Sequence, residues 1–290
     1  MAKKLDYNLK SMAAQNQHVK KFYKLSADLF GAYEEYRKMC GLVDQAATKF
    51  AEERRAATED GNLLTQLGAA IDAAEAEIAF RPKMQSALFV AIYALTEDTM
   101  NRVCDLLHEV SLEGAQAGGK EPIAPNDLKG SGLPRARCYL EKVHSVRFGD
   151  DFAAVADYLR ELRNAFAHTS GDTTVNNYDK IKKAEDRLRR YLRGRTLTEP
   201  VVKMAYKLHA IELTPGTFSL SIKHDFNESM IEVLARESAG LLSAIDEHIL
   251  ALTGCPPVNE SQLGVELNKF IIDTLTQSVS NEEHGDRTVE

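Results

Sequence analysis

The chain has 290 residues, of which 44% are hydrophobic and 7% aromatic, with no Trp, and its formal net charge is -7. This length and apolar content suffice for a sizeable core in one or two domains, and the acidic balance excludes a general polyanion-binding protein, so that any nucleic-acid site must be a local patch. The cysteines are far apart and form no C-x-x-C pair, which argues against structural zinc and a disulfide framework and is typical of a reducing cytosol: Cys40, Cys104, Cys138 and Cys255.

The start of the chain and its apolar runs bear on membrane association. Residues 1–6 lead into polar sequence without an apolar segment, so we expect no signal peptide. The longest apolar run, 87–95, is too short to cross a membrane. We therefore expect a cytoplasmic protein that does not bind membranes.

Residues 1–81 contain two stretches in which apolar residues recur at alternating steps of three and four. The first runs from Val19 to Phe50 and the second from Leu64 to Ile78, and a turn signal at 60–62 lies between them. This spacing predicts a long N-terminal helical hairpin. Its helices are either two members of a bundle or a separate dimerising coiled coil.

A break is expected at Pro82, because proline cannot continue a helix. The next segment, 82–110, is apolar nearly all round in its first half, which predicts a central helix interrupted by the acids Glu97 and Asp98. Residues 113–134 are rich in Gly and Pro and predict an exposed loop. A short helix follows at 135–146.

The segment 155–171 predicts an amphipathic helix that ends at a Gly. Val155, Leu159, Leu162 and Phe166 form its apolar side, and Arg163, Asn164 and His168 lie on its polar side. Asn164 and His168 are four residues apart and share a face, whereas Arg163 and His168 are five apart, about 140° around the helix. The Arg and His side chains therefore meet only if the last turn loosens or if a second copy of the helix faces this one.

The remaining sequence predicts a basic helix, a hairpin and a closing helix. From 179 to 195 there are eight Lys or Arg and three acids, which indicates either a solvated face or an attraction for phosphate. Alternating residues at 208–213 and 217–222 predict one small β-hairpin insertion, and 227–252 predicts a long helix. Residues 256–290 predict an amphipathic segment and a disordered tail.

The pattern Arg163-Asn164-x-x-x-His168 at the end of a helix resembles the signature of the HEPN family, all-helical domains of which many are RNA-cutting toxins or anti-phage effectors. The resemblance predicts an all-α fold with an HEPN-like helical bundle at 82–255. It does not extend to the N-terminal helical hairpin at 1–81. It also implies a homodimer with a shared cleft, products with a 2',3'-cyclic phosphate, and an acid on the facing helix, for which Glu97 is the candidate.

The chemistry of these residue types agrees with RNA cleavage. RNA supplies its own nucleophile, the 2'-hydroxyl. Imidazole moves protons near neutral pH, which suits His168; guanidinium grips phosphate oxygens, which suits Arg163; and Asn164 can orient either group. No metal or cofactor is required. The basic side chains expected to bind RNA are Arg135, Arg137, Lys180, Lys183, Arg187 and Arg190.

Three hypotheses follow from this reading. The first is a metal-independent endoribonuclease that acts as a toxin or antiviral defence effector. The second is a non-catalytic HEPN-like module that binds nucleotide, RNA or a partner protein, and the third is a helical scaffold. Alternatively, the motif residues have only a structural role, in which Arg163 pairs with Glu161 or with a neighbouring helix and His168 caps the end of its helix. The region 1–81 is expected to sense a trigger or join a partner such as an antitoxin or a sensor protein.

Overall fold

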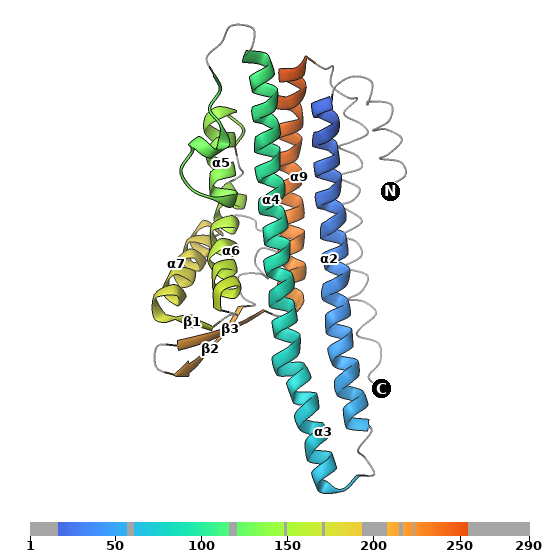
Figure 1. Cartoon of the computed structure of the whole chain (residues 1–290). Helices are drawn as coiled ribbons and strands as arrows, with labels where there is room; N and C mark the ends of the chain where they lie inside the picture. The colour runs from blue at the N-terminus through green and yellow to red at the C-terminus, as the bar shows by residue number, and fades with distance from the viewer. Residues whose placement is uncertain are drawn as a thin grey trace. The chain divides into compact units, whose positions relative to one another are not determined.

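The computed structural model describes residues 17–56, 61–115, 121–147, 150–169, 172–192, 208–214, 217–222 and 224–254. This part of the chain is mainly helical, as predicted, and it contains seven α-helices (Figure 1): α2 (Gln17–Ala56), α3 (Leu63–Glu75), α4 (Arg81–Ala115), α5 (Gly132–Val143), α6 (Asp150–Thr169), α7 (Val175–Leu192) and α9 (His224–Thr253). None of these described helices combines the length and the hydropathy that crossing a bilayer requires. The segment predicted at 256–290 lies outside the described residues.

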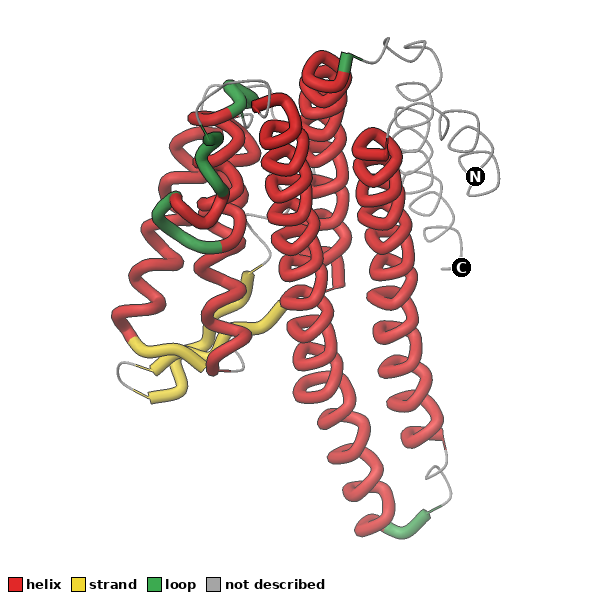
Figure 2. Tube along the Cα trace, turned by 45° about the horizontal axis from the view of Figure 1, so that its top comes forward, coloured by secondary structure: helices red, strands yellow, loops and turns green. Residues whose placement is uncertain are grey.

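A small antiparallel sheet accompanies the helices, with the strand order β1-β3-β2. Strands β2 (Leu208–Thr214) and β3 (Thr217–Ile222) pair as the hairpin that the alternating residues predict. Strand β1 (Asp172–Thr174), which the sequence interpretation missed, pairs with β3 and lies between α6 and α7 in the chain. Figure 2 shows the strands at the ends of these two helices, so the sheet ties the connection between α6 and α7 in place.

The chain forms two compact units, each made of separate segments. Unit 1 comprises 1–29, 97–149 and 234–290, and unit 2 comprises 30–96 and 150–233. The motif helix α6 and the basic helix α7 belong to unit 2, whereas α5 belongs to unit 1. The three consecutive parts expected from the sequence, 1–81, 82–255 and 256–290, stay a prediction.

Aromatic rings and two buried amides hold unit 2 together. Phe89 on α4 contacts Phe166 on α6 and Phe226 on α9 edge to face, each at 5.9 Å between ring centroids. Beside them, Gln85 Nε2 donates to the carbonyl of Cys40 on α2 at 2.9 Å, and Asn227 Nδ2 donates to Gln85 Oε1 at 2.8 Å. These hydrogen bonds satisfy polar groups whose burial would otherwise destabilise the unit.

The break predicted at Pro82 is wrong, because the helix continues through it. The π-helical turn η1 (Ala76–Phe80) connects α3 to α4, and the N–H of Arg81 donates to the carbonyl of Ala76, five residues back. Pro82 then lies in the first turn of α4, directly after the π-helical turn, where the backbone hydrogen bonds are already shifted by one residue. A proline is tolerated there, since the π-helical turn interrupts the regular series of backbone hydrogen bonds to which its missing N–H would have contributed.

Helix α3 packs with its small residues inward. Ala69 and Ala73 are buried, as is Ala76 at the start of the following π-helical turn, whereas Leu64 and Leu67, which continue the spacing of the predicted seam, are exposed. Ion pairs from Arg54 and Arg55 of α2 to Asp72 and Glu77 link the two segments of the hairpin. The expected helical hairpin is therefore present, but the large apolar residues of α3 are exposed.

Unit 1 contains a buried histidine pair at the end of α5. His144 Nδ1 lies 2.9 Å from His248 Nε2 of α9, and the His144 ring contacts Tyr139 edge to face. Burial, followed by the nearby His248 and His108, lowers the pKa of His144 from 6.5 to about 4, and burial also lowers that of His248. Both rings are therefore neutral in the folded protein near pH 7.

This pair makes the free energy of unfolding depend on pH. The unfolded chain protonates His144 near pH 6.5, whereas the folded chain resists protonation until about pH 4. The unfolded state therefore binds more protons between these values, and the free energy of unfolding falls by about 3 kcal/mol as the pH is lowered through this window. Urea denaturation of wild type and His144→Phe at pH 7 and pH 4.5 measures the difference. An equal loss in both proteins would contradict the prediction.

Candidate functional site

Helix α6 is fixed by the side chains that it buries. Phe152, Val155, Tyr158, Leu159, Leu162 and Phe166 are all buried. They recur at three- and four-residue steps, so they cover one side of the helix and hold it against the core of unit 2. The helix remains α-helical to Thr169, and strand β1 begins at Asp172. The polar residues near its C-terminal end are therefore presented by a rigid support.

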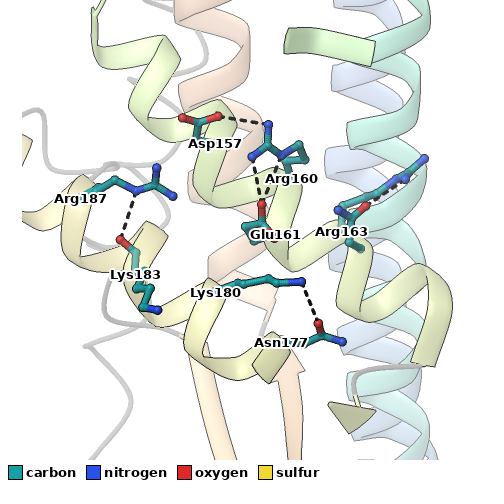
Figure 3. Close-up of polar contacts among 9 residues, drawn as sticks. Asp157, Arg160, Glu161, Arg163, Asn177, Lys180, Lys183 and Arg187 are labelled. Atoms are coloured by element: carbon teal, nitrogen blue, oxygen red, sulfur yellow. Dashed lines mark hydrogen bonds and ion pairs between the residues drawn. The ribbon is translucent and has the colours of Figure 1, made fainter. Parts of the chain in front are cut away.

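Arg163 and Asn164 interact with each other. Arg163 Nη1 donates to Asn164 Oδ1 at 3.2 Å, and both side chains are half-buried. Arg163 Nε is buried and has no hydrogen-bond partner among the described residues. In Figure 3 the Arg163 side chain points away from Arg160 and from the lysines of α7.

His168 lies in the last turn of α6 and is exposed. Because the helix is regular through Thr169, the possibility that its last turn loosens to bring Arg163 and His168 together is wrong. Five residues along a regular helix place these two side chains about 140° apart, whereas Asn164 and His168 stay on neighbouring positions. Within one chain the motif therefore does not converge on a single point.

The expected alternative pairing of Arg163 with Glu161 is not observed. Glu161 instead accepts from Arg160 Nη2 at 3.0 Å, and Arg160 also lies 3.5 Å from Asp157 (Figure 3). Among the described residues, Arg163 makes no ion pair. Its guanidinium charge is therefore not cancelled locally in the way that the charge of Arg160 is.

Glu97, the candidate supporting acid, lies in unit 1 beside the start of α5. A Cβ added to Gly132, whose φ is +59°, would meet the Glu97 carboxylate. The first N–H groups of a helix favour a nearby anion, so a carboxylate at this position stabilises the N-terminal end of α5. A role for Glu97 at the motif stays a prediction.

Two of the predicted RNA-binding arginines also lie in unit 1 and have other partners. Arg135 Nη1 donates to Asn126 Oδ1 at 2.8 Å, and Arg137 forms an ion pair with Glu141 at 2.8 Å. These contacts connect α5 to the preceding turn and reinforce the helix itself. Neither arginine belongs to the unit that carries the motif.

The other four predicted RNA-binding residues form a continuous stripe on α7: Lys180, Lys183, Arg187 and Arg190. Their spacing of three, four and three keeps them within about 80° of one another along about 15 Å of helix. All four are exposed, and within the described part of the chain none forms an ion pair. Exposed acids at Asp179 and Asp186 lie at the edge of this stripe.

Glu185 is a charged residue of this region that the sequence analysis missed. It is buried on α7, where its Oε1 accepts from Arg189 and its Oε2 lies 3.0 Å from Lys182. The signal was available, because Lys182, Glu185 and Arg189 stand at three- and four-residue steps. This one carboxylate pairs with two cations of α7, whereas the four residues of the stripe form no ion pair among the described residues.

Comparison of the chain with protein-family models, with curated proteins and with solved structures finds no match. The described residues contain no group of three or more His, Cys, Asp or Glu side chains placed to hold a metal ion. Among the described residues, the candidate functional side chains are therefore those of α6 and α7.

The contact between Glu97 and Gly132 predicts a coupled loss of stability. Gly132→Ala lowers the free energy of unfolding by about 1–3 kcal/mol, because a side chain is strained at positive φ and the new methyl group displaces the carboxylate. In a Glu97→Ala background the steric part disappears and only the backbone strain remains. Urea denaturation of both single variants and the double variant measures this. Strictly additive losses would contradict the assigned contact.

Proposed function

We propose that this chain is a metal-independent, HEPN-type endoribonuclease that acts as a toxin or anti-phage defence effector. The observation that supports it is the placement of His168, exposed at the end of a rigid helix, about one turn after a hydrogen-bonded Arg163–Asn164 pair. The exposed imidazole is accessible to a bound RNA strand. The guanidinium keeps a charge that no described acid neutralises.

The proposed reaction is an internal transesterification of RNA. A base removes the proton of the 2'-hydroxyl, the 2'-oxygen bonds to the adjacent phosphorus, and the bond from phosphorus to the 5'-oxygen breaks as that oxygen takes up a proton. His168 moves protons in this sequence, and Arg163 stabilises the negative charge on the phosphoryl oxygens. The products are a 2',3'-cyclic phosphate and a 5'-hydroxyl.

Two copies of α6 are required to bring the two groups together. One copy presents Arg163 and His168 about 140° apart, so a single phosphate does not contact both. When two such helices face each other across a two-fold axis, the Arg of one copy lies near the His of the other. The side-chain hydrogen bond from Arg163 to Asn164 limits the positions of the guanidinium, which favours a fixed geometry in this shared cleft.

The α7 stripe supports RNA as the substrate. Four exposed cations without ion pairs among the described residues, aligned over about 15 Å of helix, suit a run of phosphates. Lys182 and Arg189 of the same helix are instead paired with Glu185, so the cations that remain without an ion pair are those of the stripe.

A second function is favoured by the divergence of Arg163 and His168 within one chain. If the chain does not place two α6 helices face to face, the α7 stripe still offers a surface for phosphate. The protein would then be a non-catalytic module that binds RNA. Cleavage assays separate this function from the first.

The nuclease proposal predicts cleavage that survives chelation. Purified protein incubated with structured RNA and EDTA should yield 2',3'-cyclic phosphate ends, and Arg163→Ala and His168→Ala should each lower the rate by about 10²- to 10⁴-fold. Arg160→Ala is the matched control on the same helix, because Arg160 is already paired with acids. Binding without cleavage would support the non-catalytic module instead.

Mixing the two inactive proteins tests the shared cleft. A heterodimer of Arg163→Ala and His168→Ala subunits contains one intact site, with its Arg from one copy and its His from the other. An equimolar mixture that exchanges subunits should therefore regain about one quarter of wild-type activity. Absence of any recovery, with subunit exchange verified by mass spectrometry, would place both groups in one chain.

The α7 stripe predicts a salt-dependent contribution to RNA affinity. Lys183→Ala combined with Arg187→Ala should weaken binding on the order of tenfold and reduce the slope of log affinity against log salt by roughly 1.5, because two phosphate contacts are lost. Lys182→Ala, which removes a cation already paired with Glu185, should leave the slope nearly unchanged. Filter binding over a salt series measures both, and equal slopes would contradict the role of the stripe.

A further inference from the structure

The outward face of α3 is apolar and exposed although small residues fill the inward face. Leu63 and Leu64 are 80% and 79% exposed, and Leu67 and Ile71 are 56% and 53% exposed. The buried positions are Ala69, Ala73 and Ala76. An amphipathic helix that packs only within its own chain buries its large side chains and exposes its small ones, and α3 does the reverse.

Leu64 and Ile71 lie at equal distances along the helix from the point between Leu67 and Gly68. In an antiparallel pair of α3 helices centred there, Leu64 of one copy lies opposite Ile71 of the other. Leu67 then lies over Gly68, where the space in front of the Cα is open to 4 Å. Leu64, Leu67 and Ile71 therefore meet a large side chain or enter the space above a glycine, which allows close helix packing.

The charges of the face agree with the same arrangement. Between Leu63 and Ala74 the single charged residue is Asp72, which is paired with Arg54 of the same chain. Two such faces therefore meet without repulsion between like charges.

We propose that two copies of this chain associate through the outward faces of α3, as an antiparallel pair with the axis between Leu67 and Gly68. The face is distinct from α6 and does not rest on the proposed nuclease function. Because its apolar centre has only four large side chains per copy, the expected dissociation constant is micromolar, on the order of 10 µM.

Sedimentation equilibrium over a dilution series tests the association. Leu67→Glu should raise the dissociation constant about a hundredfold, since it buries two unpaired charges, and Gly68→Leu should raise it about tenfold by filling the space that Leu67 occupies. Matched controls on α2 are Leu42→Glu, at an exposed leucine, and Gly31→Leu, at an exposed glycine with open space in front of it. These controls should associate as the wild type does.

Disulfide trapping tests the antiparallel direction. In a Cys138→Ser and Cys255→Ser background, a mixture of Leu64→Cys and Ile71→Cys proteins should form the mixed disulfide in preference to either symmetric one. Preferred Leu64–Leu64 bonds would overturn the antiparallel pair.

Two further results would overturn the proposal as a whole. The first is a chain that stays monomeric at all concentrations, which leaves the face to another occupant. The second is an assembly whose mass Leu67→Glu does not reduce, which indicates that association occurs only elsewhere, for example through α6. Circular dichroism of each variant confirms that it is folded. The readout is mass, so loss of RNA cleavage alone does not affect the conclusion.

Discussion

The regular backbone of α6 is the constraint on which the functional interpretation depends. An α-helix separates residues five apart by about 140°, and α6 keeps this geometry to its last turn because its apolar side is buried along its whole length and strand β1 follows at once. Phe166, between Asn164 and His168, contacts Phe89 of the core. The packing that makes the motif rigid is thus also what keeps Arg163 and His168 from meeting within one chain.

Ion pairing divides the cations of α6 and α7 into two groups. Arg160 is neutralised by Asp157 and Glu161, and Arg189 by the buried Glu185. Each of these ion pairs lies within one helix, and it leaves the paired cation less available to a ligand. Arg163 and the α7 stripe are not paired in this way among the described residues, so the local positive charge of an acidic protein is concentrated there.

The sequence was sufficient where periodicity and burial coincide. The presence and approximate positions of α6, α7 and α9 follow from apolar residues at three- and four-residue steps, although each helix begins earlier than predicted. The hairpin follows from alternation. The sequence was insufficient where the outcome depends on contacts distant in the chain. Strand β1 has only three residues and is defined by its pairing with β3, and nothing in the sequence indicates that Glu97 lies close to Gly132. Pro82 was read as a break because local rules do not predict a π-helical turn.

Helices α2 and α3 carry the same heptad-like spacing and use it in opposite ways. On α2 the apolar positions Leu29 and Tyr33 are buried within the chain, whereas on α3 the corresponding positions Leu64 and Leu67 are exposed. Spacing specifies which residues share a face, but it does not specify what that face contacts. The size of the residues on the opposite face determines which face is buried, because a face of alanines lets two helices approach closely. Once Ala69 and Ala73 pack inward, the leucines of α3 remain outside.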